Sequence, residues 1–225
     1  MTTATAFHDF KNKLKTIYED RESENITDWV FENVTGSKRW QRRESQDKEL
    51  EITASEKIIR YLQELLKHKP VQYVLEEAWF YKLKFYVNEY VLIPRPETEE
   101  LIEWIIEDYK REKYSKQTNI IDIGTGSGCI PVILKRELQN TNIAAIDVSE
   151  KALSVAKKNA ESLEAQIDFF QIDFLNEHAW KTLGLYDTIV SNPPYIPINE
   201  KESLARNVTD FEPWEALFVA KNDPF

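Results

Sequence analysis

Residues 191–197, Ser-Asn-Pro-Pro-Tyr-Ile-Pro, carry the residue types best suited to chemistry in this chain. The Asn192 side chain offers both hydrogen-bond donors and an acceptor. Pro193 and Pro194 fix the backbone and remove two backbone donors, which leaves the carbonyl groups around them as acceptors for another molecule. Tyr195 adds an aromatic face. A surface turn at the end of a strand explains most Asn-Pro pairs, but this combination predicts a small pocket for a planar group that bears an NH2.

A second motif, Asp-Ile-Gly-Thr-Gly-Ser-Gly at residues 122–128, contains three of the five glycines in the chain. It follows an apolar run and precedes a helix-compatible stretch, residues 130–138. A strand, a glycine-rich turn and a helix in this order predict the start of a Rossmann-like unit, where N–H groups at the helix N-terminus face a ligand. Cys129 stands where a dinucleotide fingerprint needs a further glycine, and no P-loop lysine follows. The spacing is instead typical of loops that bind S-adenosylmethionine.

Carboxylates and an aromatic ring follow the next predicted strands. The run 142–146 ends in Asp147, nineteen residues beyond the glycine loop, where a carboxylate can accept both hydroxyls of a ribose. Its alternative role is to cap the following helix, but Ser149 is available for that. The run 167–171 leads to Asp173 and Phe174, which suit the edge and face of an adenine, although a loop carboxylate is more often merely solvated. The run 186–190 delivers Asn192, so we expect four strand ends to converge on one crevice.

Together these motifs resemble those of the protein-(glutamine-N5) methyltransferases, which modify peptide-chain release factors. The resemblance covers nearly the whole chain. Its marks are Val-Leu-Ile-Pro-Arg-Pro-Glu-Thr-Glu at residues 91–99, the loop 122–128, Ile-Asp-Val-Ser at 146–149 with Ala152 and Leu153, and the segment 191–197. Asn-Pro-Pro-Tyr alone is shared with enzymes that methylate exocyclic amines of nucleobases. Its combination with Pro-Arg-Pro-Glu-Thr-Glu is far more specific.

The resemblance implies transfer of a methyl group from S-adenosylmethionine to the glutamine side-chain amide in the Gly-Gly-Gln loop of release factors. Two alternatives remain open: a methyltransferase for an exocyclic amine of a nucleobase in RNA or DNA, and a non-catalytic fragment that binds a partner through its helical part. The implied catalytic residues are Asn192, Pro193, Pro194 and Tyr195. The implied cofactor-binding residues are Gly124, Thr125, Gly126, Ser127 and Gly128 at the methionine end, Asp147 at the ribose, Asp173 and Phe174 at the adenine, and Asn192.

Departures from the family pattern lie in three places. Phe174 stands where the family often has tryptophan, so the expected stacking area on adenine is smaller. Glu76 and Lys82 stand where the family usually has glycine, so we expect a reshaped hairpin. The family also continues beyond the segment that matches residues 211–217, so we expect a truncated chain in which the last strands of the sheet are missing.

Composition fits a globular, cytoplasmic protein: 42% of the 225 residues are hydrophobic and 30% are charged, and no apolar run is long enough to cross a bilayer. One cysteine excludes an intramolecular disulfide, and with three histidines it gives no credible metal spacing, so no metal is expected. The net charge is −10, and residues from 120 onward include 9 basic and 16 acidic side chains. Such a surface repels a phosphate backbone, so we expect a protein partner with a basic surface and no direct binding of nucleic acid or membrane.

Helical spacing and turn signals predict three regions. Residues 1–70 form a helical domain, which the resemblance implies would dock the substrate. It has one apolar stripe at Phe7, Phe10, Leu14 and Ile17 and another at Ile58, Ile59, Leu62, Leu65 and Leu66. Thr53 and Glu56 predict a capping box there. Residues 71–96 form a linker with a β-hairpin made of 79–87 and 90–93. Residues 97–225 form the methyltransferase domain, which begins with a helix over 97–113.

The expected fold is therefore α/β: a Rossmann-like S-adenosylmethionine-dependent methyltransferase sheet, preceded in the chain by a small N-terminal helical bundle. Cys129 is expected to be a small packed residue near the glycine loop. The sequence assigns no unique role to Arg95 and Glu97. An ion pair between these two, which would hold the linker, is the simplest interpretation.

Overall fold

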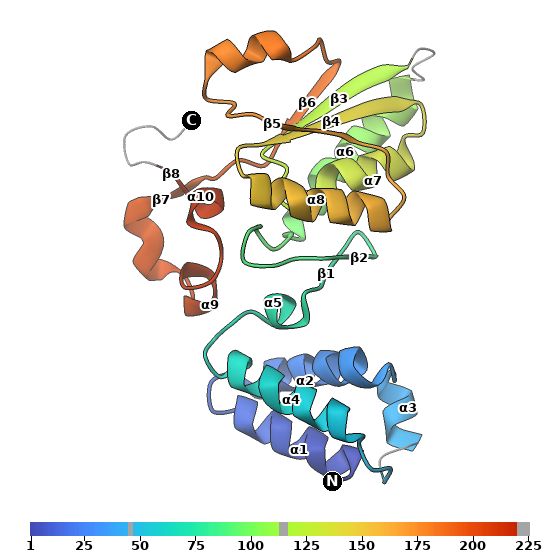
Figure 1. Ribbon diagram of the computed structural model, residues 1–225, viewed down its shortest axis with the longest axis vertical. Helices are drawn as coiled ribbons and strands as arrows, with labels where there is room; N and C mark the ends of the chain where they lie inside the picture. The colour runs from blue at the N-terminus through green and yellow to red at the C-terminus, as the bar shows by residue number, and fades with distance from the viewer. Residues whose placement is uncertain (45–46, 113–116, 220–225) are drawn as a thin grey trace. The chain divides into compact units, whose positions relative to one another are not determined.

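The structure is a computed structural model that describes residues 1–44, 47–112 and 117–219 (Figure 1). Its contacts divide the chain into two compact units. The first unit comprises Met1–Leu75 and Arg206–Phe211, and the second comprises Glu76–Ala205 and Glu212–Phe225. All residues predicted to bind cofactor or substrate belong to the second unit. None of the described helices is long and apolar enough to cross a membrane.

The first unit is a small helical bundle. Its part within Met1–Leu75 contains α1 (Thr3–Leu14), α2 (Asp20–Thr35), α3 (Arg39–Glu44), α4 (Ile52–Leu65) and α5 (Val71–Leu75). Phe10 and Phe31 pack edge to face, with ring centroids 5.8 Å apart, and Leu14 and Leu65 are fully buried beside them. Burial of each such side chain contributes roughly 1.5–3 kcal/mol, so the predicted helical stripes supply the core of this unit.

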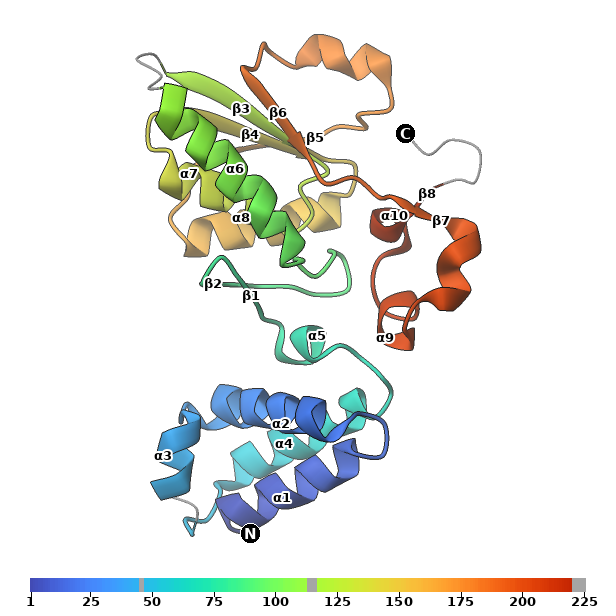
Figure 2. The ribbon, with the colours of Figure 1, turned by 180° about the vertical axis from the view of Figure 1, so that it is seen from behind.

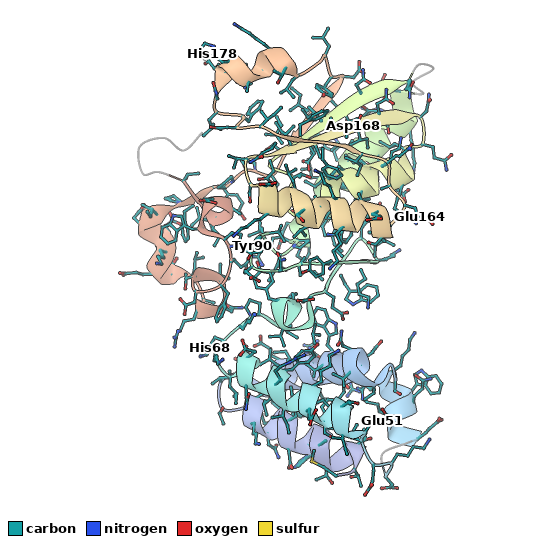
Figure 3. All side chains as sticks on the ribbon, in the orientation of Figure 1. Glu51, His68, Tyr90, Glu164, Asp168 and His178 are labelled. Carbon is teal, nitrogen blue, oxygen red and sulfur yellow. The ribbon has the colours of Figure 1, made fainter. Side chains whose placement is uncertain are left out.

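Two details predicted for α4 are wrong. The helix begins after Glu51 (labelled in Figure 3), so Thr53 lies inside the first turn and no side-chain capping bond forms there. Ile59 and Leu66 remain 52% and 37% exposed, whereas Ile58, Leu62 and Leu65 are buried. Neighbouring residues on a helix point about 100° apart, so Ile59 and Leu66 point away from the side on which Ile58 and Leu65 are buried.

A four-stranded parallel sheet forms the centre of the second unit. Its strands are β3 (Thr118–Ile123), β4 (Thr141–Asp147), β5 (Asp168–Gln171) and β6 (Thr188–Ser191), in the order β5-β4-β3-β6. Helices α6 (Glu97–Glu112), α7 (Cys129–Glu137) and α8 (Glu150–Ser162) pack against one face, grouped beside the sheet in Figures 1 and 2. This is a Rossmann-like arrangement of a parallel sheet and helices, as the sequence predicts.

Alternation along the strands divides their apolar residues between the two faces. Ile120, Ile143 and Val190 join the core beneath the helices, whereas Ile121 and Ile146 lie in a second cluster on the opposite face. This two-sided burial explains why the strands are nearly continuous apolar runs rather than alternating ones.

The hairpin is shorter than predicted. Strands β1 (Ala78–Phe80) and β2 (Leu83–Phe85) pair antiparallel, and the predicted strand at 90–93 does not form. Tyr81 and Lys82 between the strands both have positive φ, 49° and 62°, as the central residues of a two-residue hairpin turn of type I′ do. Glu76 also has positive φ, 55°. The two positions where the family usually has glycine, Glu76 and Lys82, thus keep a backbone conformation that suits glycine.

Short elements lie on both sides of β6 in the chain. A 3-10 helix, η1 (Glu177–Thr182), precedes β6. The elements η2 (Ile198–Ser203), α9 (Arg206–Thr209) and α10 (Trp214–Leu217) follow it. Strands β7 (Ile196–Pro197) and β8 (Phe218–Val219) pair in parallel. The predicted end of the methyltransferase domain at residue 225 lies outside the described residues.

Candidate functional site

The carboxyl ends of four parallel strands bring the predicted site residues to one edge of the sheet. Ile123 of β3 lies in register with Ile146 of β4 on one side and Ser191 of β6 on the other. The next residues along these strands are Gly124, Asp147 and Asn192, so all three leave the sheet side by side. Asp147 is in register with Gln171 of β5, which leads toward Asp173. Parallel strands of similar length make this convergence a consequence of topology.

The glycine loop is folded back onto β4. Gly124 and Thr125 donate backbone hydrogen bonds to the Ile146 carbonyl at 2.9 and 3.0 Å. Asp147 holds the same loop through its side chain, because Oδ2 accepts from the Gly126 N–H at 2.9 Å. Its Oδ1 accepts from the Ser149 N–H at 2.9 Å. An ionised carboxylate has about four acceptor sites, so Asp147 keeps capacity for further donors.

Helix α8 follows directly and is capped as predicted. The Ser149 hydroxyl accepts from the Ala152 N–H at 3.2 Å, which leaves Asp147 for the loop. Gly128 packs tightly on this helix: a Cβ added there would lie 2.9 Å from the Cβ of Ala156, and the φ of Gly128 is +77°. Glycine is required at this position for both reasons. Cys129 behind it is buried, which raises the pKa of its thiol to about 12 and keeps it an inert packed residue, as expected.

Asn159 on α8 connects the glycine loop to the chain beyond the hairpin. Its Nδ2 donates to the carbonyl of Ser127 at 2.9 Å and to the carbonyl of Tyr86 at 2.9 Å. Its Oδ1 accepts from the Tyr86 N–H at 2.7 Å. The side chain is fully buried and both ends of its amide are engaged. In the first turn of the same helix, the Lys151 ammonium lies 4.4 Å from the ring centroid of Tyr90 (labelled in Figure 3).

Asp122, the last buried residue of β3, was not among the predicted site residues. It is completely buried, and neither of its carboxylate oxygens nor the Thr125 hydroxyl has a hydrogen-bond partner among the described residues. Burial raises the pKa of Asp122 to about 7; the nearby Thr125 hydroxyl lowers it and the charge of Asp147 raises it. Its place directly before the glycine loop was visible in the sequence, but its lack of a hydrogen-bond partner among the described residues was not. A buried acid without a partner among the described residues needs a hydrogen-bond donor from water, an ion or a ligand.

The Asn192 side chain is half-buried and fixed at one end. Its Nδ2 donates to the Thr98 hydroxyl of α6 at 3.2 Å, which leaves Oδ1 without a partner among the described residues. The Ser191 hydroxyl donates to the Ile123 carbonyl at 2.9 Å and ties the end of β6 to β3. Pro193 is exposed and Pro194 is half-buried. Tyr195 is 63% exposed and presents its ring at the surface.

Asp173 and Phe174 lie beyond β5. Asp173 is exposed, and its Oδ1 accepts from the Leu175 N–H at 3.0 Å. Phe174 stacks on Trp180 of η1, with ring centroids 5.3 Å apart and planes 26° apart, and the Trp180 indole donates to the Phe174 carbonyl at 2.8 Å. One face of Phe174 is thus occupied by a residue that the sequence did not single out. The contact spans a loop, and no short-range pattern predicts it.

The expected ion pair between Arg95 and Glu97 does not form. Glu97 is exposed at the first position of α6, where a carboxylate also suits the positive end of the helix dipole. Arg95 instead donates to Glu212 at 2.6 Å, and the Ile93 N–H donates to the same carboxylate at 3.3 Å. Burial raises the pKa of Glu212, and the Arg95 charge opposes this rise.

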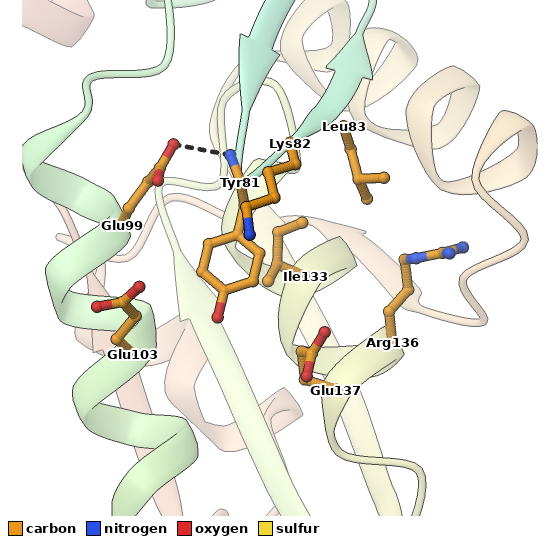
Figure 4. A pocket seen from close by; sticks show the side chains of 8 residues that line it. All are labelled: Tyr81, Lys82, Leu83, Glu99, Glu103, Ile133, Arg136 and Glu137. Carbon is orange, nitrogen blue, oxygen red and sulfur yellow. Dashed lines mark hydrogen bonds between the residues drawn. The ribbon is translucent and has the colours of Figure 1, made fainter.

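A separate cavity of about 390 Å³ lies between the hairpin turn and helices α6 and α7 (Figure 4). It is lined by Tyr81, Lys82, Leu83, Glu99, Glu103, Ile133, Arg136 and Glu137, and the Glu99 carboxylate accepts from the Tyr81 N–H at 2.7 Å. None of its lining residues was predicted to bind cofactor or substrate. The site at the sheet edge is therefore defined by strand ends and hydrogen bonds rather than by this cavity.

Comparison with known proteins finds relatives that agree on one family. Residues 103–210 match the family described as "Methyltransferase small domain". The chain is 42% identical over 214 residues to the release factor glutamine methyltransferase of Flavobacterium psychrophilum, covering 95% of this chain and 74% of that protein. The proteins of the same name from Bacteroides thetaiotaomicron and Bacillus anthracis are 42% and 38% identical, and the matches cover 71% and 74% of this chain. These two matches span 55% and 59% of the relatives' own length.

Likeness to solved structures is weaker. An S-adenosylmethionine-dependent methyltransferase from Agrobacterium tumefaciens is 17% identical with a TM-score of 0.44, covering 52% of this chain and 39% of that one. A similarity of this size adds nothing to what the sequence relatives give.

Proposed function

The chain belongs to the release factor glutamine methyltransferase family, and we propose that it transfers a methyl group from S-adenosylmethionine to a release factor. The acceptor is the side-chain amide nitrogen of the glutamine in the Gly-Gly-Gln loop. The observation that carries the proposal is the register of Ile123 with Ser191. It places Asn192, which would receive the glutamine, directly beside Gly124, where the cofactor loop begins.

The residues at the sheet edge fit S-adenosylmethionine. The buried, unpartnered pair Asp122 and Thr125 calls for a donor, and the amino group at the methionine end of this cofactor is cationic. Asp147 retains acceptor capacity for the ribose hydroxyls. Asp173 and Phe174 would take the adenine, with Trp180 supporting the far face of Phe174. The remaining loop residues, Gly124 to Gly128, would lie against the methionine end.

The substrate side must overcome the weak nucleophilicity of an amide. The nitrogen lone pair is delocalised into the carbonyl group, as in the peptide bond. Bound S-adenosylmethionine supplies an electrophilic methyl group on a sulfonium. Asn192 Oδ1 and the Pro193 carbonyl would each accept one amide hydrogen of the glutamine, which turns the lone pair toward the methyl group. Positioning of this kind can lower a barrier by roughly 7–11 kcal/mol at best.

The same two acceptors also stabilise the positive charge that develops on the amide nitrogen during transfer. No side chain needs to act as a general base in this step, because the proton lost afterwards is acidic enough for water to take. Tyr195 would pack on the glutamine side chain, which accounts for its exposed ring before the substrate binds.

Charge and organisation support a protein partner. The chain carries a net charge of −10, which suits a partner with a basic surface and disfavours direct binding to nucleic acid. The helical region 1–70 would dock the release factor, 71–96 would link it to the catalytic part, and 97–225 would perform the reaction. Because release factors act in translation, we place the reaction in the cytoplasm.

The test is methylation with S-adenosylmethionine that carries a labelled methyl group. Purified release factor, a release factor with Gln→Ala in its Gly-Gly-Gln loop, RNA and DNA are offered as separate substrates. Label should enter only the release factor with the intact loop. Label in RNA or DNA alone would replace this proposal with a nucleobase methyltransferase.

A further inference from the structure

Thr98 stands behind the predicted catalytic amide. It lies in the first turn of α6 and is 7% exposed. Its hydroxyl accepts from Asn192 Nδ2 at 3.2 Å, although the two residues are 94 positions apart in the sequence. Thr98 belongs to the Pro-Arg-Pro-Glu-Thr-Glu segment, in which Arg95 and Glu97 have no unique role predicted from sequence. The hydrogen bond connects this segment to Asn-Pro-Pro-Tyr.

The Thr98 hydroxyl is held in place independently of any substrate. The Thr98 N–H donates to the Arg95 carbonyl at 3.0 Å, which starts the helix. Ile102, one turn further on, is fully buried against the sheet and fixes the helix. The Arg95 side chain is in turn fixed by Glu212. Thr98 is buried, so the surrounding atoms restrict the positions that its hydroxyl can take.

The two ends of the Asn192 amide are chemically different. The nitrogen end donates only and the oxygen end accepts only. A glutamine that presents an NH2 group needs the oxygen. In the structure the nitrogen is turned to Thr98, so the oxygen is the end left to accept from the substrate.

We propose that Thr98 is a positioning residue for methyl transfer: its hydroxyl holds the Asn192 carboxamide with Oδ1 directed to the substrate NH2. This rests on the function proposed above. Loss of the hydroxyl releases the amide to rotate, and a rotated amide offers a donor where the substrate also offers donors. The expected consequence is a lower kcat with unchanged binding of cofactor.

The test compares Thr98→Val, Thr98→Ser, Asn192→Ala and the double variant Thr98→Val/Asn192→Ala in the full chain. Thr98→Val should lower kcat about tenfold, as expected for the loss of roughly one hydrogen bond, and leave the Kd for S-adenosylmethionine within about twofold. Thr98→Ser should recover most of the rate. In the Asn192→Ala background, Thr98→Val should cause no further loss, because its only route to the reaction is through that amide.

Thr141→Val is the matched control. Thr141 is also a buried threonine of the second unit, and its hydroxyl donates to the Leu138 carbonyl at 2.6 Å at the opposite end of the sheet. This variant should lose stability without losing kcat. Losses that multiply in the double variant, or a Thr98→Val rate loss that merely follows its loss of melting temperature, would overturn the proposal. If the wild type methylates only a nucleic acid, the same cycle with that substrate decides the role of Thr98 separately from the identity of the acceptor.

Discussion

Arg95 and Glu212 form an ion pair with a nitrogen–oxygen distance of 2.6 Å, although 117 positions separate them in the sequence. The Glu212 side chain is 1% exposed, whereas that of Arg95 is 34% exposed. Arg95 precedes α6 and Glu212 precedes α10, so the pair fixes the start of the helix that carries Thr98 to a segment late in the chain. The pairing connects the Pro-Arg-Pro-Glu-Thr-Glu segment to the segment at 211–217.

Arg95→Ala should destabilise the protein by about 3 kcal/mol at neutral pH, the lower end of the range for breaking a buried pair, because Arg95 is partly solvated. Burial already raises the pKa of Glu212, and removal of the arginine raises it further. The loss should therefore grow as pH rises and shrink in acid, where Glu212 is protonated. Urea unfolding at several pH values measures this. Arg95→Ala/Glu212→Gln should recover most of the stability, and Glu97→Ala should change it by less than about 0.5 kcal/mol. An Arg95→Ala loss that does not vary with pH would contradict this explanation.

Asn192→Ala should lower turnover at least tenfold while leaving cofactor affinity nearly unchanged, because Asn192 is assigned mainly to the substrate amide. Single-turnover rates and calorimetry with S-adenosylmethionine give the two quantities. Asn192→Asp is a useful companion, since it keeps an acceptor but cannot donate to Thr98. A loss of cofactor affinity equal to the loss of rate would place Asn192 on the cofactor instead.

Asp147→Ala should have the opposite effect and weaken cofactor binding about tenfold or more. The variant removes the expected acceptor for ribose and also releases the Gly126 N–H from its 2.9 Å bond. Calorimetry measures the affinity, and turnover at saturating cofactor should stay within about threefold of the wild type. The control is Asp187→Ala, whose exposed side chain accepts from the Asn119 N–H at 2.8 Å just before β6 begins, at the opposite end of the sheet from the site. Unchanged affinity in Asp147→Ala would remove the ribose assignment.

Asp122 should make stability and cofactor binding depend on pH. Its pKa is about 7 in the folded chain against an ordinary value of 3.8, so the folded state retains a proton that the unfolded state has lost between these values. Its contribution to stability is therefore present below about pH 4 and is lost as pH rises toward 7. Affinity for the cationic cofactor should rise through the same pH range, because the ionised acid binds it better. Asp122→Asn should make both stability and cofactor affinity depend less on pH, as measured by unfolding and by calorimetry. If the variant shows the same pH dependence as the wild type, another group is responsible for it.

Lys82→Gly should stabilise the protein by about 0.5–1 kcal/mol. Lys82 is exposed with a φ of 62°, a conformation that costs most residues about 1–2 kcal/mol, part of which the greater freedom of glycine in the unfolded chain offsets. Lys82→Ala is the matched control, because alanine keeps the strain while removing the side chain. Thermal unfolding of the two variants separates the effects. Equal stabilisation by alanine would point to the charge rather than to the backbone.

The parts of the fold that depend on local pattern were predictable from the sequence. Apolar runs that end in Gly124, Asp147 and Asn192 identified three strand ends, and parallel topology then brought them together. Ser149 was predictable as a cap because its signal is three residues long. The capping box at Thr53 was wrong because α4 begins at Ile52, directly after Glu51, and short patterns locate a helix boundary only to within one or two residues.

Contacts between distant segments were not predictable in the same way. Arg95 had an acid two residues away, Glu97, and its true partner lies in a segment with no recognisable charge pattern. Thr98 and Trp180 likewise act through single contacts that depend on where whole elements pack. Tertiary packing decides such pairings, and one sequence contains no periodic signal for them.

Asn159 uses the oxygen and both hydrogens of its amide on the backbone of Ser127 and Tyr86. Breaking any one of these bonds would leave a buried polar group without a hydrogen-bond partner, which is energetically costly. The backbone of the glycine bend is therefore fixed before any ligand arrives, and the entropic cost of ordering this bend falls in folding rather than in ligand binding.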